Sequence, residues 1–90
     1  MTFPIKNITI KDIKTVQISL NSIGKVKSFV NTISQFEYDF DLISGRYVID
    51  AKSIMGIFSL DLSKPIDLAI HTEDNLNEIL EALKPYIISQ

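Results

Sequence analysis

The side chains of this sequence that could do chemistry are a few serines, one histidine and several aspartates. With a single histidine, His71, and no cysteine, the chain has no Ser-His-Asp triad, no Cys-His pair and no credible zinc site. His71 follows an apolar run and precedes Thr72, which favours an exposed or lightly bonded loop residue. The aspartates are most simply interpreted as solvated surface carboxylates: Asp39, Asp41, Asp50 and Asp61.

Ser53 stands directly in front of a short, strongly apolar run, and this arrangement predicts the start of a helix. The apolar residues of the run recur mostly at helical intervals: Ile54, Met55, Ile57, Phe58 and Leu60. Residues 61–65 have the composition of a loop, and Pro65 cannot continue a helix. A helix of about two turns must then carry a large apolar surface, so we expect part of that surface to face outward.

The composition favours one small globular domain spanning residues 1–90, with 46% hydrophobic residues and a net charge of −2. That charge gives no electrostatic reason to expect nucleic acid or an anionic membrane as partner. Secreted domains of this size usually have disulfides, so the lack of cysteine makes a cytoplasmic location the default expectation. The N-terminus lacks a signal-peptide pattern, and no apolar run approaches the length of a membrane span.

Alternating apolar residues predict four strands, at residues 16–20, 36–42, 46–50 and 66–70. Ser44 and Gly45 indicate a tight turn, in which Gly45 can take positive φ. Upstream of these strands, Ile8 and Ile10 either lengthen the first strand or add a separate edge segment, and residues 1–12 are therefore an extension of undecided role.

Apolar spacings of three and four predict helices at residues 24–34, directly after Ser53, and from about 76 to 87. The first helix has this apolar stripe: Ile23, Val26, Phe29, Val30 and Ile33. We expect Thr72 to cap the last helix and Pro85 to bend or fray its end, with Ile87 near the limit of its buried stripe. The order of elements predicts an α+β open-faced β-sandwich, a four-stranded antiparallel sheet with three helices on one face.

Residues 51–60, AKSIMGIFSL, resemble the regulatory segment of HPr, the histidine-containing phosphocarrier of the bacterial sugar phosphotransferase system. The resemblance runs without gaps from about residue 16 to 87, and Phe29 and Val30 are similar to a Phe-Val pair in the first helix of that family. The alignment puts Ser22 at the position of the phosphorylated histidine and Gly24 at that of an arginine two residues further on. The resemblance therefore implies an HPr-like member that lacks the active-site histidine.

A serine hydroxyl at position 22 needs a base for activation, and its phosphate ester would be too stable to serve as a phosphoryl donor, whereas imidazole is itself a nucleophile. Ser22 is most simply interpreted as a helix cap. Lys25 and Lys27, with the free N–H groups of the helix start, form a candidate anion-binding corner that could support residual phosphotransfer. Ordinary phosphocarrier activity, and any catalytic residue, is not expected.

The resemblance makes Ser53 the counterpart of a serine that a kinase/phosphorylase modifies, and it makes Ile54, Met55 and Phe58 a patch that docks partner proteins. A phosphate at an exposed helix N-terminus gains about 0.3 to 1 kcal/mol. The implied role is a regulatory or interaction module, not an enzyme, with no cofactor and with phosphotransferase enzymes, HPr kinase/phosphorylase or a sugar-responsive regulator as partners. The alternatives are residual carrier activity and an HPr-like fold with an unrelated binding role.

Overall fold

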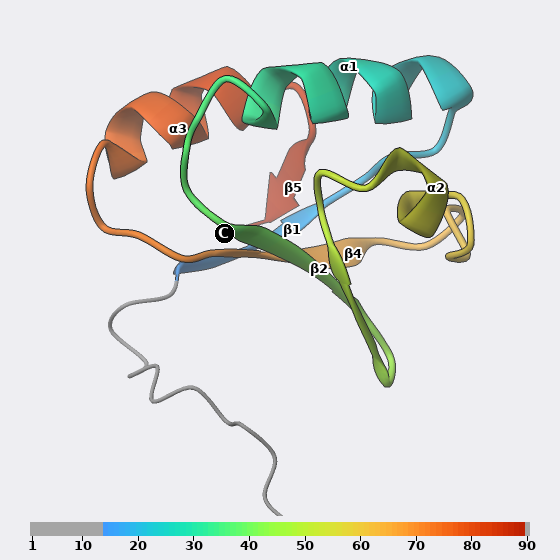
Figure 1. Cartoon of the computed structure of the whole chain (residues 1–90). Coiled ribbons are helices and arrows are strands. Elements are labelled where there is room, and N and C mark those ends of the chain that lie inside the picture. The colour runs from blue at the N-terminus through green and yellow to red at the C-terminus, as the bar shows by residue number, and fades with distance from the viewer. Residues whose placement is uncertain (1–13, 90) are drawn as a thin grey trace, which may run out of the picture.

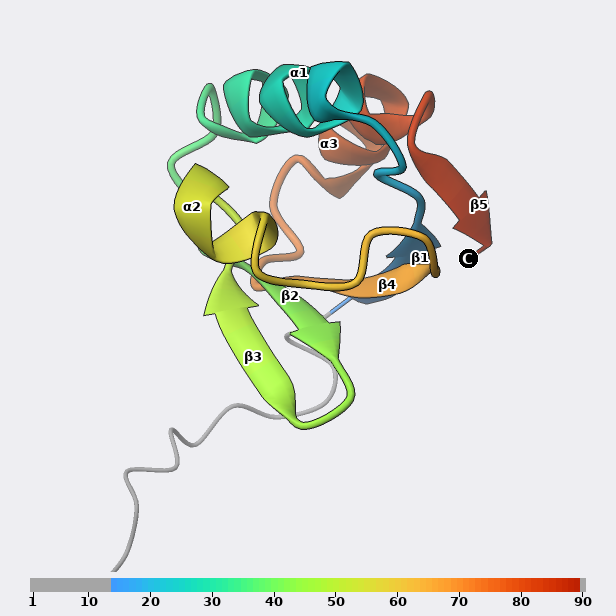
Figure 2. The same ribbon diagram turned by 90° about the vertical axis from the view of Figure 1, so that its right-hand side faces the viewer.

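The structure, a computed structural model, describes residues 14–89 (Figure 1). Its elements are β1 (Lys14–Ile18), α1 (Ile23–Ile33), β2 (Phe40–Ser44), β3 (Tyr47–Asp50), α2 (Ile54–Ile57), β4 (Ile66–Ile70), α3 (Leu76–Leu83) and β5 (Ile87–Ser89). The expectation for residues 1–12, including Ile8 and Ile10, lies outside the described residues. The predicted α+β open-faced sandwich is confirmed, because the three helices cover one face of an antiparallel sheet (Figures 1 and 2).

The sheet of the described residues has five strands in the order β3-β2-β4-β1-β5, so the prediction of four strands was short by one. The additional strand, β5, pairs antiparallel with β1 and places Ile87 opposite Ile18. Ile87 therefore belongs to a strand, not to the end of the last helix. The reason lies at Pro85: it cannot extend a helix, α3 ends at Leu83, and Tyr86 then accepts a backbone hydrogen bond from Ser19 that starts the return along β1.

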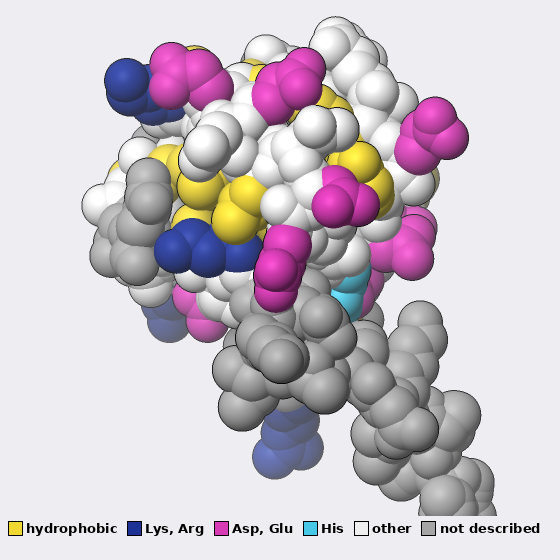
Figure 3. All heavy atoms as spheres, turned by 90° about the vertical axis from the view of Figure 1, so that its left-hand side faces the viewer, with side chains coloured by type: hydrophobic (Ala, Val, Ile, Leu, Met, Phe, Trp, Pro, Cys, Tyr) yellow, Lys and Arg dark blue, Asp and Glu magenta, His cyan; other side chains and the backbone are white. Residues whose placement is uncertain are grey.

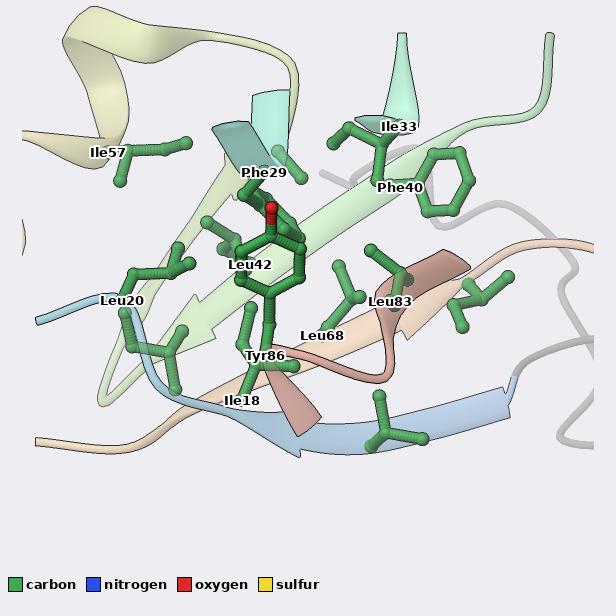
Figure 4. Close-up of a cluster of buried hydrophobic side chains, with 14 of the residues drawn as sticks. Ile18, Leu20, Phe29, Ile33, Phe40, Leu42, Ile57, Leu68, Leu83 and Tyr86 are labelled. Carbon is green, nitrogen blue, oxygen red and sulfur yellow. The ribbon is translucent and has the colours of Figure 1, made fainter. Parts of the chain in front are cut away.

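Side chains from the inner face of the sheet and from all three helices form one core (Figure 4). Its largest fully buried members are Phe29, Phe40, Ile18, Leu20, Ile33, Leu42, Ile57, Ile66, Leu68, Ile70, Ile79 and Leu83. Tyr86 closes it from the C-terminal side, with its ring edge-on to Phe29 at a centroid distance of 5.6 Å. The Tyr86 hydroxyl is hydrogen-bonded to the hydroxyl of Ser28 on α1, so the only buried tyrosine among the described residues has a partner for its polar end.

The first helix has the predicted N-cap but not the full predicted stripe. Val26, Phe29 and Ile33 are buried, whereas Ile23 is 63% exposed. Ile23 is the first residue of α1, directly after the N-cap Ser22. The prediction that Ile23 belongs to the buried stripe was wrong.

The second strand begins later than predicted, at Phe40, so Phe36 and Tyr38 lie in the segment that connects α1 to β2. Both aromatic side chains nevertheless pack partly against the core. The alternation of apolar and acidic residues continues through this connection and hides the real start of the strand. The turn that follows β2 has Gly45 at a φ of 61°, as the sequence indicates.

The last helix is not capped by Thr72. It begins at Leu76 after Asn75, which has a φ of 55° and no side-chain capping bond. The Thr72 hydroxyl instead accepts a hydrogen bond from the N–H of Asp74 at 2.8 Å. This bond belongs to a local turn that precedes the helix, so the hydroxyl does not cap the helix.

Candidate functional site

The start of α1 is the first candidate site. Ser22 has extended backbone angles, and its hydroxyl accepts a hydrogen bond from the N–H of Lys25 at 3.1 Å, so the predicted cap is confirmed. The carbonyl of Ser22 accepts a further bond from Val26 N–H at 3.1 Å. Gly24 is exposed, and a Cβ built on it would meet nothing within 4 Å, so packing does not require a glycine there.

Lys25 and Lys27 both lie exposed on the first turns of α1. The first turn of α1 has no acidic residue, and neither lysine forms an ion pair with a described residue. The positive end of the helix and two free ammonium groups therefore share one corner. A specific anion site at this corner stays a prediction, because exposed lysines on a helix are usually solvated.

The single histidine lies at the other end of the sheet. In the register of β1 and β4, Lys14 pairs with Ile70 and Ile18 pairs with Ile66. His71 therefore follows the end of β4 that lies beside the start of β1, whereas Ser22 comes after the far end of β1. His71 lies on the left-hand face of the molecule in the view of Figure 1, and α1 begins at the right (Figures 1 and 3).

His71 forms hydrogen bonds with Asp41 and Asp39. Its Nε2 lies 2.8 Å from Oδ2 of Asp41, and its backbone N–H donates to the carbonyl of Asp39 at 3.1 Å. The side chains of His71 and Asp41 are 19% and 35% exposed. His71 is thus a loop residue with one side-chain hydrogen bond, in line with the expectation, whereas Asp41 is half-buried and bonded and not simply a solvated surface carboxylate. Thirty residues separate the two in sequence, and only the pairing of Phe40 with Ile70 brings them together.

The start of α2 is the second candidate site, and Ser53 has the predicted role of N-cap. Its hydroxyl accepts a hydrogen bond from Gly56 N–H at 3.2 Å, and its carbonyl accepts one from Ile57 N–H at 3.0 Å. Ser53 itself is exposed. The Ser53 hydroxyl oxygen accepts the one bond from Gly56 N–H, and its O–H proton has no hydrogen-bond partner among the described residues.

The helix that Ser53 caps is shorter than predicted, because α2 ends at Ile57 and residues 58–60 continue as turns. Ile57 is fully buried and Leu60 is partly buried. Met55 and Phe58 are 78% and 40% exposed, and Ile54 is half-buried. We call Ile54, Met55 and Phe58 the α2 surface. The expectation that a short helix leaves apolar side chains outside is confirmed.

Lys52 and Asp61 lie at the two ends of the segment that contains α2. Nothing in the sequence indicated a role for Lys52. Lys52 turns away from Ser53: its ammonium group donates to the carbonyl of Phe36 at 2.7 Å and lies 5.5 Å from the centroid of the Phe40 ring. Beyond α2, hydrogen bonds from the hydroxyl and N–H of Ser63, together with nearby Lys64, hold the pKa of Asp61 below its ordinary value.

Neither a membrane span nor a metal-binding cluster is found within residues 14–89. No helix of that part is long and apolar enough to cross a membrane. No group of three or more His, Asp and Glu side chains there comes close enough together to bind a metal ion.

The open-faced α+β sandwich is the fold of HPr proteins, and the comparisons agree. The family model described as "PTS HPr component phosphorylation site" matches residues 24–88. The chain therefore belongs to the HPr family of the sugar phosphotransferase system. It is similar to a solved HPr-C-His from Thermoanaerobacter tengcongensis, with 29% identity over 80% of this chain and 88% of that chain and a TM-score of 0.66. A search of the curated proteins gave no match.

Proposed function

We propose that this HPr-family protein acts as a regulatory or protein-interaction module and does not carry phosphate on histidine. The observation that carries the proposal is the position of His71. It is the only histidine of the sequence, it follows β4, and it is bonded to Asp41 at the end of the sheet remote from the start of α1. On this view the protein is a cytoplasmic binding protein that catalyses no reaction of its own.

The start of α1 offers poor chemistry for a phosphoryl relay. The Ser22 hydroxyl already accepts the capping bond from Lys25 N–H, and no described carboxylate or imidazole hydrogen-bonds to it as a base. Gly24 contributes no charge to a transferring phosphoryl group, although a side chain would fit there. Lys25 and Lys27 add positive charge to this corner but do not supply the imidazole nucleophile that a phosphoryl relay uses. These features support the loss of the carrier step.

Ser53 is the better site for covalent regulation. Its hydroxyl is exposed at the start of α2, where a phosphate would meet free backbone N–H groups. Added charge at this point would change the rim of the α2 surface directly, because Ser53 precedes Ile54 in the chain and caps the same short helix.

The α2 surface supports a docking role. Met55 and Phe58 present flexible and aromatic apolar side chains that the fold leaves outside, while Ile57 anchors the helix below them. We propose that this surface binds a phosphotransferase enzyme, an HPr kinase/phosphorylase or a sugar-responsive regulator. Phosphate on Ser53 would then act as the signal that changes which of these partners is bound.

The first experiment incubates the protein with ATP and the HPr kinase of its own host and follows the intact mass. We expect one added phosphate on the wild-type chain and none on Ser53→Ala. A Ser59→Ala variant is the matched control, because Ser59 is an exposed serine of the same segment, and it should be modified like the wild type. An unmodified wild-type chain that also binds no phosphotransferase component would contradict the proposal.

The second experiment tests the relay. The protein is incubated with phosphoenolpyruvate and the first enzyme of the phosphotransferase system, and we expect no acid-labile phosphate on the chain. Labelling that disappears in Ser22→Ala, or in a variant without Lys25 and Lys27, would establish residual carrier activity at the start of α1. That result would replace the regulatory proposal.

A further inference from the structure

The free edge of β3 carries a pattern that is complementary to itself. β3 is the outermost strand on its side of the sheet, and no strand within residues 14–89 pairs with its outer edge (Figure 2). Two of its apolar side chains are unusually open, since Tyr47 is 66% and Val48 is 62% exposed. An exposed strand edge of this kind is a template for pairing with another chain.

The hairpin fixes which backbone groups point outward. Ser44 pairs with Tyr47 across the two-residue turn, in which Gly45 has a φ of 61° and Arg46 has no positive φ, as in a type II′ turn. The pair that closes such a turn is hydrogen-bonded, and antiparallel pairs alternate along the ladder. The next pair, Ile43 with Val48, is therefore a non-hydrogen-bonded pair, so the N–H and C=O of Val48 point away from β2.

The same alternation points the N–H of Asp50 and the carbonyl of Arg46 outward. The carbonyl of Asp50 is already used, because it accepts a bond from Ser53 N–H at 3.0 Å. If two β3 strands meet antiparallel with Val48 opposite its copy, each Val48 exchanges two backbone bonds with the other. Each Asp50 N–H then donates to the Arg46 carbonyl of the second chain, which gives four backbone bonds in total.

The side chains agree with this register. Arg46 of one chain lies directly opposite Asp50 of the other, on the same face, and the symmetry makes this ion pair twice. Within residues 14–89 neither residue forms an ion pair of its own, and Asp50 uses only Oδ1, as acceptor from Lys52 N–H at 2.9 Å. On the helix side, exposed Tyr47 lies opposite partly buried Ile49 of the second chain.

We infer that the β3 edge is a self-association surface, and that its occupant is a second copy of this chain joined antiparallel at Val48 into one continuous ten-stranded sheet. The charge order Arg46-Tyr47-Val48-Ile49-Asp50 selects the antiparallel arrangement, because a parallel one would not bring Arg46 and Asp50 together. The two-fold axis is perpendicular to the sheet, so both α2 surfaces face the same side and could bind a partner bivalently.

A contact of two short strands buries far less than a standard interface of about 1,600 Å², so the dimer is weak. We expect a dissociation constant of about 0.1 to 1 mM. Sedimentation equilibrium of the full chain up to about 1 mM should show a rising average mass. Amide exchange of Val48 and Asp50 should slow with concentration, whereas that of Tyr47, which bonds to β2, should not change.

Charge exchange gives the decisive test. Arg46→Glu places two acids opposite each other, and Asp50→Lys places two bases opposite each other, so each variant alone should dimerise about tenfold more weakly. A mixture of the two variants makes both pairs complementary, so it should associate as a heterodimer. Because Arg46 is exposed, its replacement should not disturb the fold of the monomer. Val48→Lys, which sets like charges against each other, provides a second way to disrupt the dimer.

Ile88→Lys is the matched control, because Ile88 is 53% exposed on the opposite edge strand, β5. It should associate like the wild type. A wild-type chain that stays monomeric at 1 mM, a mixture that associates no better than its components, or a Val48→Lys variant that associates normally would each overturn the inference. Loss of association in Ile88→Lys alone would place the contact on β5 and overturn it as well.

Discussion

Ser22 and Ser53 each begin a helix with the same hydrogen bond, in which the backbone N–H three residues on donates to the serine hydroxyl, yet the two helices differ in what they bury. α1 has 11 residues and buries Val26, Phe29 and Ile33. α2 has four residues and buries only Ile57. A cap therefore defines where a helix starts, while its length and the surface beneath it decide whether its apolar side chains end up in the core or available to a partner.

The largest expected effect concerns the one buried residue that holds α2. Ile57→Ala removes a fully buried side chain and leaves a cavity, so the free energy of unfolding should fall by about 2 to 5 kcal/mol. Urea unfolding followed by circular dichroism measures this. Met55→Ala, on the exposed side of the same helix, is the control and should change stability by less than about 0.5 kcal/mol. Equal losses at the two positions would mean that the α2 surface is part of the core.

The caps come next in size. Ser22→Ala should cost about 1 kcal/mol of global stability, because α1 is attached to the core through three buried side chains. Ser53→Ala should cost about 0.5 kcal/mol, since α2 can fray locally without disturbing the sheet. Thermal unfolding of both variants gives the comparison, and the aspartate replacements, which keep a capping acceptor, should restore most of each loss. A greater loss of stability in Ser53→Ala than in Ser22→Ala would contradict the view that α1 is coupled to the core and that α2 frays locally.

The sequence was sufficient to predict the four strands β1 to β4, the presence of the three helices and the caps at Ser22 and Ser53, because each depends on local signals. Apolar alternation indicates β4, and serine before an apolar run marks α1 and α2. The last strand was harder to predict, because Ile87 fits the apolar spacing of a helix although Pro85 ends that helix before it. The start of α3 was hard to predict for a similar reason. The turn in which the Thr72 hydroxyl accepts a bond, and the start of the helix after Asn75, cannot be read from the spacing of apolar residues.

The contacts of the candidate sites depend on pairings between distant residues. Asp41 meets His71 because β2 and β4 are neighbours, and Lys52 reaches Phe36 because the chain returns past the start of β2. Neither contact follows from spacing in the sequence. The exposed edge of β3 likewise becomes visible only when the strand order is known. Capping residues at helix starts can therefore be predicted from the sequence. The partners of side chains that meet across the sheet can be identified only once the fold is known.

The smallest expected effect is that of Gly56→Ala, which is best compared with Gly24→Ala, the glycine replacement after the other cap. Gly24 has open space around it, and alanine has the higher helix propensity, so Gly24→Ala should raise the free energy of unfolding by about 0.5 to 1 kcal/mol. At Gly56 an added Cβ would lie 3.2 Å from the Ser53 hydroxyl and 3.4 Å from Cδ1 of Ile49. The hydroxyl is held by its capping bond, so crowding should cancel the gain and leave Gly56→Ala neutral or slightly destabilising.

Thermal unfolding of the two alanine variants against the wild type decides this last comparison, with amide exchange at Gly56 or its replacement as a local measure of the Ser53 cap. Stabilisation at position 24 alone would show that the first helix start has room for the side chain it lacks, while the second is packed around its serine. Equal stabilisation at both positions would show that Ser53 is not confined by Gly56.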